Sequence, residues 1–338
     1  MRLFIKPKAR VATLNRTTSW LCALSAAAVL GLSATPVMAQ SYPTKPVRIV
    51  VPTAPGGFTD VVARILSQKL TMALGQQVVI ENKAGAGSTI GADFVAKAAP
   101  DGHTLLMTST THVLGPAVYP KLPYDTIKSF TPVARLVESA YILVVNPKVP
   151  ARNVSEFIAL AKSQPDAIHY ASSGNGSSQH LVGSMFGNMA NIQIKHVPYK
   201  GSSGATTDLL AGVVESSFAG VPNVLTLVQQ GKLRALAVTT PKRIGQLPDV
   251  PTLNEAGVTG YNASIWLALL APAGTPKDVV NRLHTEIVKA MNSADTQKAL
   301  FDAGVQLSLA APEETGEFMI KEMDRWGKVI KDMGIKAD

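Results

Sequence analysis

Cysteine is almost absent from this sequence of 338 residues, which contains only Cys22. That cysteine lies in an apolar run near the N-terminus, from Trp20 to Leu32. If this region is removed, as its composition indicates below, no cysteine remains in the mature chain. Disulfides, thiol nucleophiles and cysteine-based metal sites are then excluded, and stability must come from a large hydrophobic core.

Motifs for nucleotides, metals and nucleophilic catalysis are also missing. The sequence has no GxGxxG or GxxxxGK[ST] loop, no HExxH pair among its six histidines and no GxSxG elbow. The nearest approach to a catalytic arrangement is Ser177 and Ser178 beside His180, which leaves an exported hydrolase open as an alternative. We therefore predict no catalytic residue, no metal site and no cofactor.

Acidic residues are absent from residues 1–39, which contain five basic ones: Arg2, Lys6, Lys8, Arg10 and Arg16. The apolar run follows, and then Val37-Met38-Ala39, a small-residue cleavage pattern. This order is typical of a secretory signal peptide, so we predict cleavage after Ala39 and a periplasmic location. The run is shorter than the roughly 20 residues of a spanning helix, which argues against a permanent membrane anchor.

Most of the apparent basicity belongs to this N-terminal segment. Removing five basic and no acidic residues takes the formal net charge from +9 to +4. The remaining basic residues are interspersed with acidic ones and form no basic stripe with aromatic residues. We therefore expect no binding to nucleic acid.

The stretch from Arg48 to Asp60, RIVVPTAPGGFTD, predicts one half of a ligand site. Ile49 to Val51 are apolar and β-branched, as in a buried strand, and a glycine pair follows before a helix. We expect Thr59 or Asp60 to cap that helix. Backbone N–H groups at a helix N-terminus attract anions, so this turn favours a small carboxylate. A strand-to-helix turn that binds nothing is the alternative.

Strands and helices then alternate along the chain. Residue spacing predicts helices at 62–73 and 90–98 and strands at 77–81 and 104–108. Such βαβαβ order implies a parallel sheet whose loops after the strands share one edge, where ligands bind. The Gly-rich segment 84–91 and the hydroxyl-rich loop 108–116, which contains Thr110, both follow strands at that edge.

Two long strand-forming segments, 131–146 and 261–272, divide the chain, and each is long enough to pass from one domain to another. Between them we expect a second α/β unit, with strands at 169–172, 194–198, 215–219 and 235–239 and helices at 154–162, 178–189, 204–211 and 224–230. The mature length exceeds what one core usually serves. We therefore predict a discontinuous first domain, 40–141 plus 262–338, and a second domain, 142–261.

Two turns of the second unit, 172–181 and 198–204, also follow strands and open helices, so they could form the opposite wall of a cleft. The charged residues near these turns have two interpretations each. His180 is a ligand contact or is bonded within the fold, and Lys200 pairs with a carboxylate or is solvated. Asp60 and Asp208 cap helices, orient loops or accept an ammonium group, in preference to acting as an acid/base pair.

Four segments in this order resemble one family: VPTAPGGFTDVVAR (51–64), VIENKAGAGSTIGADFVAKAAPDGHTLL (79–106), VPYKGSSGATTDLLAGVVESSFAG (197–220) and GKLRALAVTTPKRIGQLPDVPTLNEAGVTGY (231–261). The chain is similar to the extracytoplasmic solute-binding proteins of tripartite tricarboxylate transporters, called Bug or TctC-like receptors. The resemblance implies a periplasmic binding protein type II-like fold. In it, two α/β domains joined by two crossing strands close like a flytrap over a small organic acid in the cleft.

The resemblance also implies ligand-binding residues on both sides of the cleft. The first domain holds the carboxylate largely through backbone amides and ordered water, and on this chain its residues are Gly57, Phe58, Thr59, Asp60, Ala86, Gly87, Ser88 and Thr89. The opposing wall is Ser173, Gly174, Ser177, His180, Tyr199, Lys200, Gly201 and Asp208. Ser88 and Gly204 depart from the family pattern, which often has glycine and proline there. We also expect the Phe58 ring to influence ligand preference.

Together these observations predict a monomeric periplasmic receptor that binds a mono- or dicarboxylate, aliphatic or aromatic. It would deliver this ligand to the inner-membrane permease subunits of a tripartite tricarboxylate transporter. A sensor subunit that signals the carboxylate to a membrane histidine kinase is an alternative, and an exported hydrolase is a more distant one.

Overall fold

The first strand, β1 (Val47–Val51), contains the start of the stretch from Arg48 to Asp60 and is almost wholly buried. The computed structural model describes residue 3 and residues 42–119, 121–165 and 167–333; the predicted signal peptide and its cleavage site lie outside these ranges. β1 pairs in parallel with β2 (Val78–Asn82) and with β3 (Thr104–Ser109). Helix α2 (Phe58–Leu74) follows β1, and η1 (Ala86–Ser88) and α3 (Thr89–Ala96) follow β2. The predicted parallel βαβαβ arrangement is confirmed.

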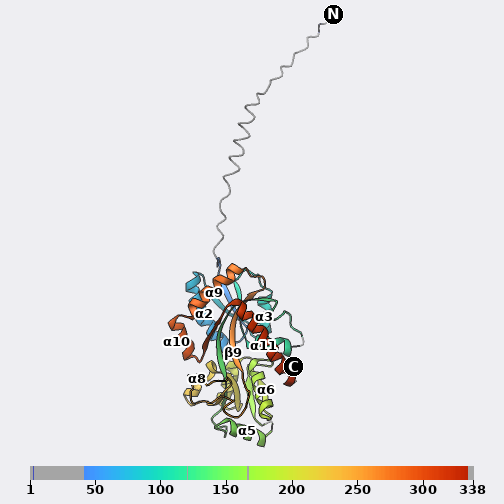
Figure 1. Ribbon diagram of the computed structural model, residues 1–338, viewed down its shortest axis with the longest axis vertical. Coiled ribbons are helices and arrows are strands. Elements are labelled where there is room, and N and C mark those ends of the chain that lie inside the picture. The colour runs from blue at the N-terminus through green and yellow to red at the C-terminus, as the bar shows by residue number, and fades with distance from the viewer. Residues whose placement is uncertain (1–2, 4–41, 120, 166, 334–338) are drawn as a thin grey trace. The chain divides into compact units, whose positions relative to one another are not determined.

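The second α/β unit is built on β5 (His169–Ser172), which pairs in parallel with β6 (Lys195–Pro198) and β7 (Ser216–Gly220). Its helices are α5 (Val154–Ser163), α6 (Ser178–Ala190), α7 (Ser202–Ala211) and α8 (Val221–Gln229), and β8 (Arg234–Val238) follows them. In Figure 1, α5, α6 and α8 lie at the end of the described part opposite to α2 and α9.

One long strand, β4 (Phe130–Val145), belongs to both parts of the sheet. From Phe130 to Ala140 it pairs antiparallel with β9 (Ser264–Pro272), and from Tyr141 to Val145 it pairs with β7. We call the part around β1, β2, β3 and β9 the first lobe, and the part around β5, β6 and β7 the second lobe. The strand order is β2-β1-β3-β9-β4-β7-β5-β6, so β4 and β9 occupy the middle of the molecule, as Figure 1 shows for β9.

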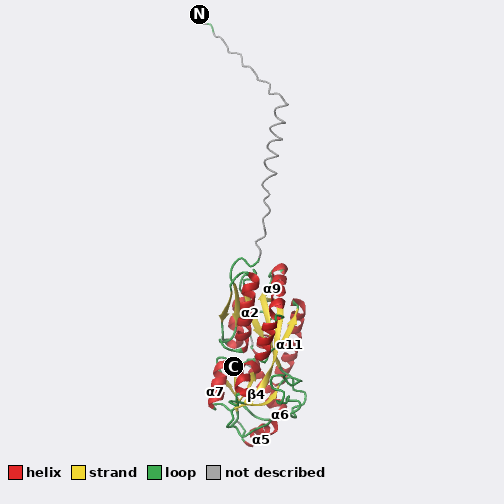
Figure 2. Ribbon diagram, turned by 90° about the vertical axis from the view of Figure 1, so that its left-hand side faces the viewer, coloured by secondary structure: helices red, strands yellow, loops and turns green. Residues whose placement is uncertain are grey.

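The C-terminal helices return to the first lobe. α9 (Lys277–Met291) packs beside α2, and α11 (Pro312–Met333) packs on α4 (Thr110–Val118) and on β4. Figure 2 shows α2, α9 and α11 as helices beside the yellow strands of this lobe. Between them, α10 (Ala294–Asp302) leads to β10 (Gln306–Ala310), which pairs with β4. Among the helices that the structure describes, none has the length and apolar character needed to cross a membrane.

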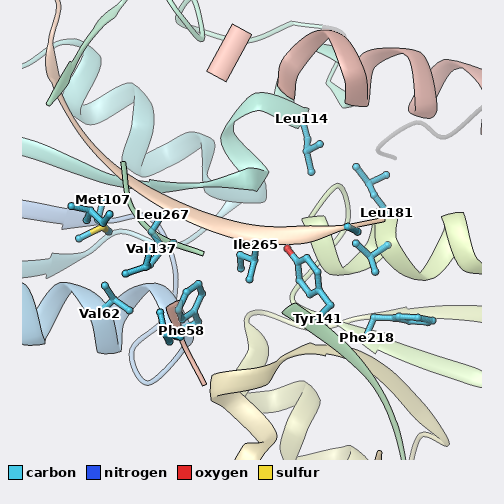
Figure 3. Packing of buried hydrophobic residues seen from close by; sticks show 14 of the residues in the cluster. Phe58, Val62, Met107, Leu114, Val137, Tyr141, Leu181, Phe218, Ile265 and Leu267 are labelled. Carbon is cyan, nitrogen blue, oxygen red and sulfur yellow. The ribbon is translucent and has the colours of Figure 1, made fainter. Parts of the chain in front are cut away.

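A continuous hydrophobic core joins the two lobes. One cluster of buried side chains includes Val62 of α2, Tyr141 of β4 and Phe218 of β7. Figure 3 shows Phe58 and Val62 toward one end of this cluster, Tyr141 and Phe218 toward the other, and Ile265 of β9 between them. The described residues from 42 onward accordingly form one compact unit.

Candidate ligand-binding site

A cavity of about 570 Å³ lies between the loops of the two lobes. The first lobe contributes Pro52, Thr53, Ala54, Gly57, Phe58, Thr59, Ala84, Gly85, Ala86, Gly87, Ser88, Ser109, Thr111 and Tyr119. The second lobe contributes Ser173, Gly174, Asn175, Ser177, Ser178, Gln179, Tyr199, Lys200, Gly201, Ser202, Gly220 and Asn223, and Ile265 of β9 completes the wall. The cavity therefore sits where strands of both lobes end and helices begin.

Helix N-termini converge on this cavity from both lobes. In the first lobe the N-cap residues that line it are Gly57 of α2, Ser88 of α3 and Ser109 of α4. In the second lobe they are Ser177 of α6, Gly201 of α7 and Gly220 of α8. The first N–H groups of a helix have no acceptor within the helix and carry its positive dipole end. The wall therefore favours a bound anion.

The loop between β1 and α2 is held by Asp60 from behind the cavity wall. Its Oδ2 accepts a hydrogen bond from the Gly56 N–H (3.0 Å) and one from Arg64 Nε (2.8 Å), and its Oδ1 accepts one from Asn82 Nδ2 (2.9 Å). Burial alone would raise the pKa of Asp60, but these hydrogen bonds and the Arg64 charge lower it below its usual value. Asp60 thus stays ionised and fixes the loop without lining the cavity.

The expectation that Thr59 or Asp60 caps α2 is wrong. The N-cap is Gly57, and no side chain bonds to the free amides there. The helix begins at Phe58, so Thr59 and Asp60 lie in its first turn. Asp60 reaches back to Gly56 instead, which leaves the first amides of α2 available to a ligand.

The loop between β2 and α3 turns through consecutive left-handed residues. The φ angles of Ala86, Gly87 and Ser88 are 45°, 56° and 76°. All three line the cavity, as the resemblance implied. Thr89 is not part of the cavity wall, and its side chain hydrogen-bonds to Tyr124.

The hydroxyl-rich segment expected to be a loop after β3 is the helix α4. Thr110 is fully buried, accepts a hydrogen bond from the Trp266 N–H (3.1 Å) and is absent from the cavity wall. Its neighbour Thr111 lines the cavity and donates to Ser178 Oγ of the second lobe (3.3 Å). The structure therefore brings Thr111 of this segment, and not Thr110, to the cavity wall.

In the second lobe, Ser177 accepts a hydrogen bond from the His180 N–H (3.3 Å) and so caps α6. His180 Nδ1 accepts a hydrogen bond from the Gly176 N–H (3.2 Å), and its ring stacks on His196 at 3.8 Å. Burial and the nearby His180 lower the pKa of His196 to about 3. His180 is bonded within the fold and is not part of the cavity wall, whereas Ser173, Gly174 and Ser177 are.

The next turn places Tyr199, Lys200 and Gly201 in the wall. Tyr199 Oη donates to Asp208 Oδ2 (2.7 Å), so Asp208 orients the tyrosine and does not itself reach the cavity. Burial and the Asp208 carboxylate raise the pKa of Tyr199 to about 12. Lys200 is the sole charged side chain among the described residues of the wall.

The sequence did not indicate that several residues of the cavity wall belong to the site. Tyr119 ends α4, Asn223 lies in α8 and Ile265 lies in a crossing strand, so only the folded chain brings them to the cavity. Ser178 and Gln179 were visible beside Ser177 in the turn that the sequence singled out. Within residues 42–119, 121–165 and 167–333, no three histidine, cysteine or acidic side chains are placed to bind a metal ion.

Two α/β lobes joined through central strands, with a cavity at the helix N-termini between them, define the class of periplasmic binding proteins. Residues 62–335 match the model of the TctC family, described as the tripartite tricarboxylate transporter family receptor. The chain belongs to this family.

Curated and structural relatives agree with this assignment. Protein BugT of Bordetella pertussis is 38% identical over 311 residues, which are 91% of this chain and 95% of BugT. A Rhodopseudomonas palustris protein solved with adipate is 35% identical with a TM-score of 0.85, and the match covers 87% of this chain and 99% of that one. MatC from Rhodopseudomonas palustris, solved with bound malate, is 34% identical with a TM-score of 0.82 over 86% of this chain and 100% of MatC.

Proposed function

We propose that this protein captures a small organic carboxylate in the periplasm and delivers it to the permease subunits of a tripartite tricarboxylate transporter. The observation that carries the proposal is the convergence of helix N-termini from both lobes on one cavity. Free amides and aligned dipoles stabilise a carboxylate without a dedicated cationic side chain. The adipate and malate bound to the two relatives are ligands of this chemical kind.

The charges of the wall support the same ligand class. Lys200 is positive, and no aspartate or glutamate belongs to the described wall. The buried carboxylate of Asp60 is neutralised behind the wall by Arg64 and by hydrogen bonds. A carboxylate therefore gains attraction in this cavity, whereas a diamine of similar size meets positive helix ends without a counter-charge.

Binding without catalysis is part of this proposal. The Ser177 hydroxyl is used as the cap of α6, and His180 Nδ1 is occupied by a backbone amide. A receptor also needs no bond-breaking group, because capture and release require only a difference in affinity between the open and closed forms. We further propose the domain division at 141/142 and 261/262 and cleavage after Ala39.

The proposed ligand contacts are those predicted residues that line the cavity, together with the polar residues that the fold adds there: Thr111, Asn175, Ser178, Gln179 and Asn223. Phe58 is only 3% exposed, packs in the core and also lines the cavity. It therefore contributes an apolar part of the wall, and Phe58→Ala tests its influence on ligand preference.

Isothermal titration of the purified protein with malate, adipate, benzoate and 1,4-diaminobutane tests the function. We expect saturable 1:1 binding of at least one carboxylate and a melting temperature that rises with its concentration, since the ligand binds only the folded state. The diamine should give neither effect. Equal binding of the diamine, or no response to a broad panel of carboxylates by folded protein, would refute the proposal.

A further inference from the structure

Tyr119 joins the two lobes across the rim of the cavity. It follows the last turn of α4 in the first lobe, and its Oη donates a hydrogen bond to the Asn175 carbonyl oxygen of the second lobe (3.2 Å). Both residues line the cavity and both are half-buried. This contact therefore links the two lobes at the site where the ligand binds.

Both lobes leave room for the Tyr119 hydroxyl by means of glycine. A Cβ atom added to Gly87 would lie 2.1 Å from Tyr119 Oη, and one added to Gly176 would lie 3.0 Å from it. Gly87 belongs to the first lobe and Gly176 to the second, and both have positive φ angles, 56° and 69°. The phenol thus occupies a socket that is complete only when the two lobes are together.

The Tyr119 contact differs from two other hydrogen bonds that join the loops around the cavity. Ser203 Oγ donates to the Pro55 carbonyl oxygen (3.3 Å), but Ser203 and Pro55 are both exposed to solvent. Thr111 Oγ1 donates to Ser178 Oγ within the buried interior. The Tyr119 pair alone, among these three, combines a half-buried donor with a fitted socket. Burial also raises the pKa of Tyr119, so the hydroxyl remains protonated and able to donate.

We propose that Tyr119 is a latch that holds the lobes closed on the ligand and thereby sets how fast the ligand leaves. The inference rests on the proposed function, because a latch matters only where a ligand is captured and released. Asn175 adjoins Gly174 in one ligand loop, and Tyr119 touches Gly87 in another. Opening the cleft separates these loops and breaks the hydrogen bond, so the bond stabilises the closed form alone.

Tyr119→Phe tests the latch, since it removes the hydroxyl and keeps the ring in its socket. In stopped-flow measurements with malate and adipate, we expect the dissociation rate to rise between about twofold and tenfold, the range for loss of one neutral hydrogen bond. The association rate should stay nearly unchanged. Tyr42→Phe is the matched control, because Tyr42 Oη also donates to a backbone carbonyl, that of Gly102, but within the first lobe.

A measurement without ligand makes the test independent of the ligand's identity. Spin labels at Met72→Cys and Val213→Cys, which replace exposed side chains of the two lobes, report the distance between the lobes in a Cys22→Ser background. In ligand-free protein, Tyr119→Phe should shift the distribution to longer distances than wild type or Tyr42→Phe. Superimposable distributions, or an equal change with Tyr42→Phe, would overturn the latch. Failure of every carboxylate to bind wild type would instead refute the proposed function, and the ligand-free distances would still decide the latch.

Discussion

At the scale of single residues, Asp60 is a buried charge that holds a loop of the cavity wall in place without lining the cavity. Its side chain is 3% exposed, yet both carboxylate oxygens are occupied by partners from the preceding loop, from the same helix and from β2. Asn82 Nδ2 also donates to the Thr53 carbonyl oxygen (3.1 Å). One carboxylate thereby ties the end of β2 to the loop whose amides face the cavity.

We predict that Asp60→Asn lowers the free energy of unfolding by about 1.5–3 kcal/mol, the range for hydrogen bonds to a charged group. It should also weaken carboxylate binding severalfold, because the loop of Thr53 to Gly57 loses its anchor. Urea unfolding and calorimetric titration measure the two effects. Asp302→Asn is the control, since its pair with Lys298 is exposed and its loss should change stability by less than about 1 kcal/mol. Equal effects of the two substitutions would contradict this role of Asp60.

The sequence predicts those site residues that belong to turns after strands, because glycine and small polar residues mark such turns. The turns that contain Gly57, Gly87, Gly174 and Gly201 were marked in this way, the family resemblance implied the individual residues, and all four line the cavity. Residues such as Tyr119 and Ile265 were not predicted, since their sequence neighbours give no sign of the cavity. His180, Thr110 and Asp208 do not line the cavity, and each forms hydrogen bonds within the protein.

At the scale of elements, glycine has different roles at the N-termini and at the C-termini of the helices. The N-termini of α2, α7 and α8 carry glycine N-caps with no side-chain bond, which leaves amides free toward the cavity. At the other end, Gly75 closes α2 in the left-handed conformation, with φ 66° and ψ 15°. The glycines thus serve the site at one end of α2 and the fold at the other.

We predict opposite stability effects for two glycine-to-alanine substitutions. A Cβ at Gly75 or at Gly327 meets nothing within 4 Å, so backbone conformation alone decides the outcome. Gly75→Ala should destabilise by about 1 kcal/mol, because its φ is left-handed. Gly327→Ala, inside α11, should stabilise by about 0.5–1 kcal/mol through higher helix propensity. Urea unfolding measures the free energy of unfolding of both variants. Changes of the same sign would show that contacts other than backbone conformation determine the effects.

Most elements could be predicted from periodicity, and the exceptions have physical reasons. β5 was predicted at its observed bounds. α4 was taken for a loop, because it contains adjacent threonines and Pro116. α10 and β10 were not identified: α10 buries only Thr296 and Leu300, and in β10 only Ala310 is buried. Short elements with so few buried residues leave a weak pattern.

At the scale of the molecule, the two lobes share a strand and a core. β4 exchanges its partner β9 for β7 after Ala140, and the cluster that contains Leu66 of the first lobe also contains Phe218 of the second. A lobe that unfolded alone would expose part of this cluster. The placement of the two cavity walls and the cohesion of the protein therefore depend on the same central strands.

We predict that the lobes unfold in one cooperative transition. Leu66→Ala and Phe218→Ala remove fully buried side chains from different lobes and should each destabilise by about 2–5 kcal/mol. In scanning calorimetry both variants should lower the temperature of the same single peak, with equal calorimetric and van't Hoff enthalpies. Two peaks, each shifted by the substitution in its own lobe, would show that the lobes unfold independently.

Acid should destabilise the protein through histidines that are neutral in the folded state. Burial lowers the pKa of His112 to about 4, and burial and His180 lower that of His196 to about 3, against about 6.5 in an unfolded chain. At a pH between the folded and the unfolded pKa, the unfolded state binds more protons than the folded state. The free energy of unfolding is therefore greatest above pH 6.5 and falls as the pH drops toward 4. Each histidine contributes a slope of up to about 1.4 kcal/mol per pH unit.

Urea unfolding at pH 7.5, 6.5, 5.5 and 4.5 measures this dependence. His112→Gln and His196→Gln should each flatten the profile below pH 6.5, even if they lower the overall stability. Profiles parallel to that of the wild type would show that groups other than these two histidines account for the acid sensitivity.

The amides at the helix N-termini belong to the backbone, and this has a consequence for how new ligand preferences can arise. Substitution of a side chain leaves a backbone N–H in place, unless the new residue is proline. Attraction for a carboxylate is therefore insensitive to most single substitutions in the wall, whereas Asn175, Gln179, Asn223 and Ile265 can be exchanged one at a time. Such a cavity can acquire a different organic acid by gradual change while every intermediate still retains a working anion site.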